Sequence, residues 1–423
     1  MKVCLLSYRG NMYSGGQGIY LYYLTRELAK LGHEVTVLVG PPYPAEMPFA
    51  RVIKIPNENF YAVKQDWLPK DNPFKIFTPL NFYEFAATRA WFFPEMLTFS
   101  LRAYRKLHQL WQAGERFDIF HDNQCLGFGY VLMKAFGPPV IASIHHPLGM
   151  DRAADFEQTQ GLKERARRVV FYPLFMPQLV ARRMDLVISG SHSSAKLVQQ
   201  TFGLDPKKMR PVWDGVDDDV FNLKNGRAKV PGRLIFVGNT EDRKKGIWYL
   251  MEALSMLPPE VHLQVVDGCS KWKFLANWLI ERYKLQGRVT FKARIPAEEL
   301  AEEYRAAEVA VVPSVYEGFG LPAAEAMACA TPVVATDGGA LPEVVGPEGL
   351  VVPAKNAKAL AEAIRKLLAD EKLRRDFGLR GHERAMKHFT WRQMAIGTAE
   401  VYREAIAIRR DMARHAPTGI HHG

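Results

Sequence analysis

Short apolar runs alternate with helical patterns along most of the chain. Such runs indicate buried strands, and the segments between them indicate helices that cover both faces of a parallel sheet. Leucines at 21, 24, 28 and 31 predict a helix over 19–31 that ends at Gly32. After a buried strand at the N-terminus, strands are predicted at 35–39, 117–121, 140–144, 186–189, 234–237, 262–266, 289–291, 309–312 and 333–336.

A polar, turn-rich segment from Trp213 to Gly232 separates the two halves of this pattern. The pattern therefore predicts an α/β protein with a first domain over 1–213 and a second over 214–390. A last helix, about 390–413, follows the final strand and helices of the second half. We expect residues 391–423 to cross back to the first domain and to end in a tail.

The segment from 41 to 98 interrupts the alternation with prolines and aromatic residues. It is interpreted either as a packed extension of the first core or as an acceptor groove or membrane-facing surface. A basic and apolar stretch over 163–183 leaves a similar choice, between a solvated helix face and docking on an anionic membrane. No apolar run reaches the ~20 residues that a spanning helix needs, so any membrane contact is expected to be peripheral.

Composition narrows the class of protein. The chain has 423 residues, of which 48% are hydrophobic and 24% charged, so two to three globular domains are expected and disorder is excluded. A net charge of +11 fits an anionic partner, while the absence of an RNA-stacking signature argues against nucleic acid. The four scattered cysteines fit a reducing compartment, and we expect a cytoplasmic protein.

An anion-binding turn is predicted between residues 309 and 325. A strand ends near Ser314, a glycine-bearing loop follows, and Pro322 suits the first position of a helix. The loop glycines allow a close backbone approach, and a helix N-terminus attracts negative charge. Glu317 lies in the loop and Glu325 in the expected first helical turn. Since two carboxylates would repel a phosphate, we expect them to face sugar hydroxyls.

A second strand–loop–helix unit, 235–254, carries three consecutive cations at 243–245. These cations could clamp a diphosphate that rests on the 318–323 turn and stabilise its charge as it leaves, without a metal. A solvated basic turn is the alternative.

The turn Gly318-x-Gly320-x-x-Ala323 followed by Asp337 also matches a dinucleotide fingerprint. An NAD-dependent dehydrogenase is therefore an alternative function. Against it, such a fingerprint normally lies in the first strand–turn–helix unit of its domain, and this one lies in the fourth.

Two of these segments resemble a known family. Glu317-x7-Glu325, continued by 332–345, and the segment 237–246 are similar to the motifs of the retaining family 4 glycosyltransferases, the glycosyl transferases group 1. The resemblance implies the GT-B fold, with two Rossmann-like doubly wound domains facing an interdomain cleft. It also implies a hexosyltransferase that moves a sugar from a nucleotide diphosphate sugar to a hydroxyl acceptor. A sugar-nucleotide epimerase of the same fold is a second alternative.

The resemblance also implies the site residues. We expect the catalytic residues to be Glu317, Lys245, His145 and Arg243, the last because Asn239 stands where the family has an arginine. His145 matches a strand-end histidine of the family, and His146 replaces its usual aspartate. The expected donor-binding residues are Gly15, Gly16, Asn239, Arg294, Gly318, Phe319, Gly320, Leu321 and Glu325.

Neither a cofactor nor a metal is expected. The run Asp217–Asp219 fits the Asp-x-Asp pattern of metal-dependent transferases, but it is interpreted as a turn with helix-capping acids. Ser191 is expected to cap a helix that begins near Ser193. We expect a UDP-sugar rather than a GDP-sugar as donor. The expected acceptor is lipid-linked or belongs to an envelope glycolipid or polysaccharide, with peripheral contact at the cytoplasmic membrane face.

Overall fold

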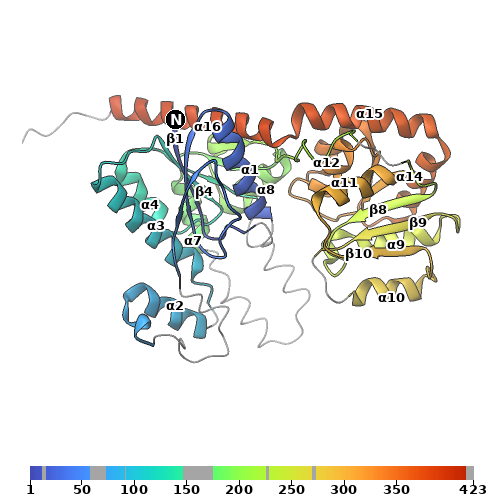
Figure 1. Ribbon diagram of the computed structural model, residues 1–423, viewed down its shortest axis with the longest axis horizontal. Coiled ribbons are helices and arrows are strands. Elements are labelled where there is room, and N and C mark those ends of the chain that lie inside the picture. Colours follow the sequence, from blue (N-terminus) through green and yellow to red (C-terminus); the bar gives the residue numbers. More distant parts are fainter. Residues whose placement is uncertain are drawn as a thin grey trace, which may run out of the picture. The chain divides into compact units, whose positions relative to one another are not determined.

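The computed structural model describes residues 1–11, 16–57, 73–90, 92–145, 175–224, 228–268 and 273–415 (Figure 1). They form two α/β units. The first comprises Met1–Gly190, Ala195–Val212 and Ala395–Gly423, and the second comprises Ser191–Ser194 and Trp213–Met394. Apart from the short segment Ser191–Ser194, the chain passes to the second unit after Val212 and returns at Ala395.

A seven-stranded sheet, entirely parallel, forms the centre of the first unit. Its strand order is β3-β2-β1-β4-β5-β6-β7, so the order reverses between β1 and β4. Ligands of open α/β sheets bind at the carboxyl ends of the strands beside such a reversal. The strands are β1 (Lys2–Ser7), β2 (Glu34–Val39), β3 (Arg51–Lys54), β4 (Ile119–Asn123), β5 (Val140–Ser143), β6 (Val187–Ser189) and β7 (Met209–Pro211).

Helices connect these strands in the manner of a doubly wound fold. They are α1 (Gly16–Lys30), α2 (Pro79–Arg89), α3 (Glu95–Gln112), α4 (Gly129–Met133), α7 (Phe175–Arg183) and α8 (His192–Phe202), with short 3₁₀ turns at η1 (Pro73–Phe77), η2 (Lys134–Phe136) and η3 (Pro206–Lys208). The backbone N–H of Ser194 donates to Ser191 Oγ at 3.0 Å, which confirms Ser191 as the cap of α8.

The last helix, α16 (Trp391–Arg414), contributes to the core of the first unit. Tyr402 is fully buried, and its hydroxyl lies 2.7 Å from Nδ1 of the buried His121 on β4. Arg210 pairs with Glu404, and Arg409 donates to the Gly137 carbonyl at 3.1 Å. Residues of α16 therefore pack in the first unit although they follow the second unit in the sequence.

The second unit contains a six-stranded parallel sheet in the order β10-β9-β8-β11-β12-β13. The strands are β8 (Arg233–Val237), β9 (His262–Val266), β10 (Val289–Lys292), β11 (Val309–Val312), β12 (Val333–Thr336) and β13 (Leu350–Val352). In β11, Ala310 and Val312 belong to one apolar cluster while Val309 and Val311 belong to another. Each face of the sheet thus has its own core, as the apolar strand pattern requires.

Helices cover both of these faces (Figure 1). One cluster includes residues of α11 (Ala297–Ala306), α12 (Leu321–Ala328), α13 (Leu341–Val345) and α15 (Glu371–His388), and the other includes residues of α9 (Ile247–Ser255), α10 (Phe274–Arg282) and α14 (Ala357–Ala369). Two 3₁₀ turns, η4 (Arg243–Lys245) and η5 (Gly346–Glu348), complete the unit. The predicted fold class of two doubly wound parallel-sheet domains is confirmed.

Some predicted boundaries were wrong. The strand expected at 117–121 runs from Ile119 to Asn123, which moves two polar residues into the strand. Three short strands were missed, namely β3, β7 and β13, and β3 lies inside the segment that interrupts the alternation. That segment therefore extends the first sheet by an edge strand with polar ends, which has no continuous apolar run to mark it.

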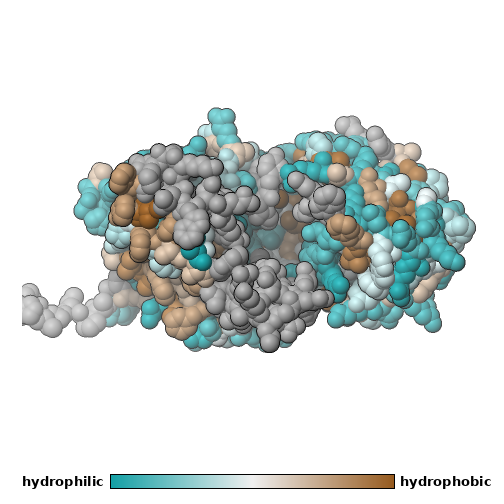
Figure 2. Space-filling model, turned by 90° about the horizontal axis from the view of Figure 1, so that it is seen from below, coloured by the Kyte–Doolittle hydropathy of each residue, from teal (hydrophilic) through white to brown (hydrophobic). Residues whose placement is uncertain are grey.

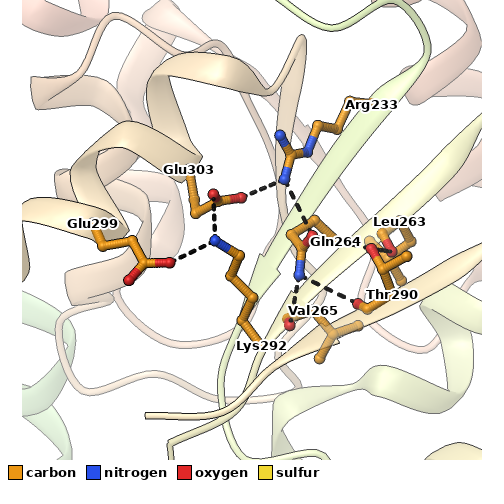
Figure 3. A network of polar contacts seen from close by, with 8 residues as sticks. All are labelled: Arg233, Leu263, Gln264, Val265, Thr290, Lys292, Glu299 and Glu303. Carbon is orange, nitrogen blue, oxygen red and sulfur yellow. Dashed lines mark hydrogen bonds and ion pairs between the residues drawn. The ribbon is translucent and has the colours of Figure 1, made fainter. Parts of the chain in front are cut away.

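A polar network links three strands of the second unit to α11 (Figure 3). The carboxylate of Glu303, which is 1% exposed, accepts from Arg233 and, at 2.9 Å, from Lys292. Lys292 also donates to Glu299 at 2.5 Å, and these two hydrogen bonds raise its pKa. Gln264 bonds Arg233 at 3.1 Å and the Thr290 hydroxyl at 3.0 Å. The network thus gives the buried Glu303 carboxylate two cationic partners, without which its burial would be costly.

Several predictions fall outside the described residues. They concern Gly15, His146, most of the basic 163–183 stretch and part of the aromatic segment. Among the described residues, no helix is both long enough and apolar enough to cross a bilayer.

We predict that Glu303→Gln destabilises the second unit by about 3 kcal/mol, because it leaves two cations without their buried carboxylate. The matched control is Glu299→Gln, which removes an exposed partner of the same lysine and should cost less than about 1 kcal/mol. Urea-induced unfolding followed by circular dichroism measures both. Equal midpoints for the two variants would show that the network does not stabilise the fold.

Candidate functional site

The candidate residues of the second unit lie on two loops at the reversal of its strand order. One loop, 238–246, follows β8, and the other, 313–320, follows the neighbouring strand β11. The backbone N–H of Val315 donates to the Lys244 carbonyl at 2.7 Å, so the two loops are joined directly. The fold therefore brings together two segments that lie about seventy residues apart in the sequence, where open α/β sheets bind ligands.

A lysine and a carboxylate meet between these loops. Lys245 Nζ lies 2.8 Å from Glu317 Oε1, and the Ser314 hydroxyl donates to the same oxygen, also at 2.8 Å. The Glu317 side chain is 11% exposed and the Lys245 side chain 29%. The cation is thus held at the mouth of the site by a nearly buried carboxylate, and its remaining N–H bonds can meet an incoming anion.

Glycines allow the loops to approach this closely. Gly246 has a φ of +72°, and a Cβ built there would lie 1.9 Å from the Pro313 carbonyl oxygen. Gly320 has a φ of +103° and is the N-cap of α12. Side chains of L-residues disfavour both conformations, so these two glycines fix the loops beside Lys245 and at the helix N-terminus.

The N-terminus of α12 begins at Leu321, one residue before the position predicted from Pro322. The backbone of Gly318–Leu321 leads into this end, where helices attract negative charge. The Phe319 side chain is buried and packs edge-on against Phe389, with ring centroids 5.6 Å apart. Phe319 can therefore offer a ligand only its backbone, because its ring belongs to the core.

Glu325 differs from its predicted setting. It is the fifth residue of α12 and lies in the second turn, so the prediction that it occupies the first turn was wrong. Its carboxylate accepts a hydrogen bond from the buried Tyr304 hydroxyl at 3.0 Å. Burial raises the pKa of Glu325 to about 7, and the Tyr304 hydrogen bond opposes that shift. A half-buried carboxylate with one such partner is suited to accept hydrogen bonds from a diol.

The other residues expected here are less closely involved. Arg243 is exposed and lies in the same 3₁₀ turn as Lys245. Asn239 Oδ1 accepts from the Glu241 backbone at 2.9 Å and so stabilises the turn. Arg294 is exposed and follows β10, where its Cα lies 3.8 Å from a Cβ built at Gly268.

In the first unit, His145 lies just after β5. Its Nε2–H donates to Asn123 Oδ1 at 3.1 Å, its backbone N–H donates to Gln124 Oε1 at 2.7 Å, and the Tyr20 ring packs edge-on against its imidazole. Asn123 Nδ2 in turn donates to the Gln17 carbonyl at 3.0 Å. The imidazole is therefore held by the carboxyl end of β4 and by α1. Gly16 is the exposed first residue of α1.

Sequence analysis missed the polar residues around His145. Besides Asn123 and Gln124, they include Ser143, whose hydroxyl bonds both His121 Nε2 and the hydroxyl of Tyr20, each at 2.8 Å. Burial lowers the pKa of His121 to about 3, so this residue stays neutral. The signal was the polar run His121-Asp122-Asn123-Gln124 at a strand end, which an apolar strand pattern passes over.

Comparison with known proteins decides the family. A sequence model of the glycosyl transferases group 1 matches residues 219–384, and a model of glycosyltransferase family 4 matches residues 14–220. The chain is 38% identical to the MMP alpha-(1->4)-mannosyltransferase of Mycolicibacterium hassiacum over 96% of its own length and 99% of that protein. This chain belongs to the family 4 glycosyltransferases.

Other relatives of this glycosyltransferase agree. It is 27% identical to the D-inositol 3-phosphate glycosyltransferase of Xylanimonas cellulosilytica, over 93% of its chain and 92% of that protein. Among solved structures, the sucrose-phosphate synthase of Thermosynechococcus elongatus matches with a TM-score of 0.70 and 26% identity, over 96% of this chain and all of that one. The predicted GT-B fold is thereby confirmed.

Neither the family nor the position of the Gly318-x-Gly320-x-x-Ala323 turn in the sheet favours the alternative of an NAD-dependent dehydrogenase. The turn Gly318-x-Gly320-x-x-Ala323 follows β11, the fourth strand of its unit, whereas a dinucleotide fingerprint follows the first. In this glycosyltransferase the first strand of the second unit is β8, and the loop after it carries Lys245.

We predict that Tyr304→Phe raises the pKa of Glu325 above about 7, because the lost hydroxyl is the donor that stabilises the carboxylate. The carboxyl chemical shift of ¹³C-labelled glutamate, followed by NMR against pH, measures the change. Tyr283→Phe, at a half-buried tyrosine outside this contact, is the control and should leave the titration unchanged. An unshifted titration in Tyr304→Phe would contradict the assignment.

Proposed function

We propose that this glycosyltransferase moves a mannosyl residue from a nucleoside diphosphate sugar to a hydroxyl acceptor, with retention of the anomeric configuration. The observation that carries the proposal is the Lys245–Glu317 contact, at the carboxyl ends of two adjacent parallel strands. A cation there can neutralise a diphosphate, and the adjoining carboxylate can accept hydrogen bonds from a hexose. The 38% identical mannosyltransferase supports mannose as the sugar.

The diphosphate is the group that the second unit is built to stabilise. In the proposed complex its oxygens meet Lys245 Nζ, the backbone at the N-terminus of α12 and the guanidinium of Arg243. As the bond between the anomeric carbon and the diphosphate oxygen breaks, negative charge grows on that oxygen. Fixed positive groups placed where charge develops lower the barrier, and they need no reorganisation during the reaction.

Retention follows most simply from attack on the face that the diphosphate leaves. The acceptor oxygen forms its bond to the anomeric carbon, and its proton passes to the departing diphosphate oxygen. The products are a glycoside and a nucleoside diphosphate, and the chain supplies no nucleophile. The mannosyltransferase relative is named for an α-(1→4) linkage, and forming such a linkage from an α-linked donor requires retention.

We assign the Glu325 carboxylate and the His145 imidazole to the recognition of hydroxyl groups. Glu325, whose pKa burial raises to about 7, accepts hydrogen bonds from the ribose diol of the nucleotide. We assign His145 to the donor sugar from the resemblance to the family, and within its own unit Asn123 and Tyr20 fix its ring. These roles come from the resemblance to the family and from the contacts that hold each side chain in one orientation.

The acceptor is proposed to be lipid-linked or part of an envelope polysaccharide. Of the aromatic segment that suggested it, Phe74, Phe77 and Phe82 are exposed by 75%, 77% and 58%. Exposed aromatic rings of this kind mark surfaces that meet an apolar partner. The peripheral membrane contact and the cytoplasmic face stay predictions.

We predict that Lys245→Ala lowers kcat by about 100- to 1000-fold, because one fixed charge at the leaving group is lost. Transfer from a radiolabelled nucleotide sugar measures the rate, and the melting temperature confirms folding. Lys358→Ala, at an exposed lysine of α14, is the matched control and should keep full activity. Unchanged turnover in Lys245→Ala would refute the proposal.

We expect EDTA to leave turnover unaffected. A loss of turnover that Mn²⁺ restores would instead favour the alternative in which Asp217–Asp219 form a metal-binding Asp-x-Asp motif.

The donor base can be identified by thermal shift. We predict that UDP and a UDP-sugar raise the melting temperature more than GDP, ADP and their sugars, since a ligand that binds only the folded state stabilises it. Glu325→Gln should weaken the shift for the preferred nucleoside diphosphate. A larger shift with GDP-mannose would overturn the choice of base but keep the transferase, whereas no shift with any nucleotide would count against both.

A further inference from the structure

The first unit contains a groove of about 490 Å³ at the edge of its sheet. It lies between the end of β3, the N-terminus of α2 and the middle of α3. Its volume falls within the range of small-molecule sites. The residues that line it are Lys54, Ile55, Pro56, Asn57, Thr78, Leu80, Asn81, Arg102, Arg105, Lys106 and Gln109.

The groove is strongly cationic. Four of its lining residues are basic, and none of the described lining residues is acidic. Arg105 and Lys54 are exposed, and Lys106 is half-buried. Lys54, Arg105 and Lys106 lie on one concave surface beside Arg102, which is paired with a carboxylate, and like charges gathered there repel one another while a low-dielectric wall concentrates their field. The groove therefore has the electrostatics of an anion-binding site.

Arg102 supplies a more specific signal. Its Nη2 donates to Asn81 Oδ1 at 2.7 Å and to Glu84 Oε2 at 2.6 Å, which orients the guanidinium from one side. Its Nη1 is buried and has no hydrogen-bond partner within the described ranges. Leaving a buried charged donor unpaired is costly, so this nitrogen calls for an acceptor that the described residues do not provide.

The N-terminus of α2 adds to the same field. Thr78 caps this eleven-residue helix, since its side chain accepts from the Asn81 backbone at 3.4 Å, and both residues line the groove. The positive end of the helix dipole thus lies at the wall opposite α3. A phosphate fits this arrangement, because several of its oxygens can accept from a guanidinium, an ammonium and a helix N-terminus at once.

Exposed aromatic residues are sequence neighbours of residues that line the groove. Phe77 directly precedes Thr78, and Phe82 directly follows Asn81. Their exposed fractions are 77% and 58%, and the Phe74 and Phe77 rings lie 6.2 Å apart. Figure 2 views the molecule from the side on which α2 lies in Figure 1, and hydrophobic residues gather there on the first unit. The segment 74–82 thus carries exposed aromatic residues next in sequence to residues that line a cationic groove.

We propose that this groove binds the phosphate group of an anionic ligand. The exposed rings of the same segment favour a phospholipid headgroup as the source, because exposed aromatic residues can enter the headgroup region while the cations meet the phosphate. A soluble phosphate monoester presents the same chemistry to the cations and is the other source. The site shares no residue with the donor contacts of the second unit, and its choice of a phospholipid rests on the membrane contact proposed above.

The test compares Arg105→Ala/Lys106→Ala with Lys196→Ala/Lys207→Ala. Both pairs remove two positive charges from the first unit, and the second pair is exposed and lies outside the groove. In one arm, the full chain is sedimented with vesicles of phosphatidylcholine containing about a third phosphatidylglycerol. In the other arm, inorganic phosphate is titrated and the melting temperature is recorded. Phosphatidylcholine vesicles alone serve as the blank.

We expect the groove variant to bind anionic vesicles about 25-fold more weakly than the wild type, which corresponds to about 1 kcal/mol for each cation. The control variant should bind as the wild type does. If only the phosphate-induced rise in melting temperature is lost, the site is a phosphate site for a soluble ligand. The proposal is overturned if both variants lose binding equally, or if the groove variant matches the wild type in both arms.

The same preparations separate this proposal from the donor site. Stabilisation by the preferred nucleoside diphosphate should be unchanged in the groove variant, because Lys245, Glu317 and Glu325 are intact. Loss of nucleotide stabilisation together with vesicle binding would indicate a general folding defect and would overturn the assignment of the groove.

Discussion

The direct contact between the loops that follow β8 and β11 is the constraint on which the site depends. A backbone hydrogen bond joins Val315 to Lys244. The residue after Lys244 is Lys245, and its ammonium lies 2.8 Å from the Glu317 carboxylate. Gly246 permits this approach, since any side chain there would collide with the Pro313 carbonyl. Parallel pairing of β8 with β11 brings the loops to the same edge of the sheet. Strand pairing, the Gly246 turn and the contact with Glu317 together fix the position of the Lys245 ammonium.

Under the proposed function, the pairing of Lys245 with Glu317 would couple neutralisation of the diphosphate to recognition of the sugar. A diphosphate that draws the ammonium toward itself also changes the hydrogen bonding of the carboxylate, which keeps a second donor in the Ser314 hydroxyl. Because Ser314 holds the same oxygen, Glu317 stays oriented when the lysine turns to an anion. The carboxylate is therefore positioned before any sugar arrives, which reduces the cost of ordering it.

Much of this structure could be predicted from sequence, and the limits have physical causes. Buried parallel strands such as β9, β11 and β12 are continuous apolar runs and were located to the residue. β3 and β13 are short strands at sheet edges with little burial, so their sequences resemble loops. Motif spacing brought Lys245 and Glu317 to one site but could not show that they pair. The support of His145 by Asn123 and Gln124, and the Glu303 network, depend on contacts between distant segments that no local pattern encodes.

The burial of Tyr402 against His121 has a consequence for biosynthesis. These two side chains are separated by 281 positions in the chain, and a ribosome delivers the histidine long before the tyrosine. Until α16 has been translated, the N-terminal unit lacks the helix that carries Tyr402. Maturation of this transferase is consequently not strictly vectorial, and a nascent chain stalled before α16 would expose a polar gap in a sheet that is otherwise assembled.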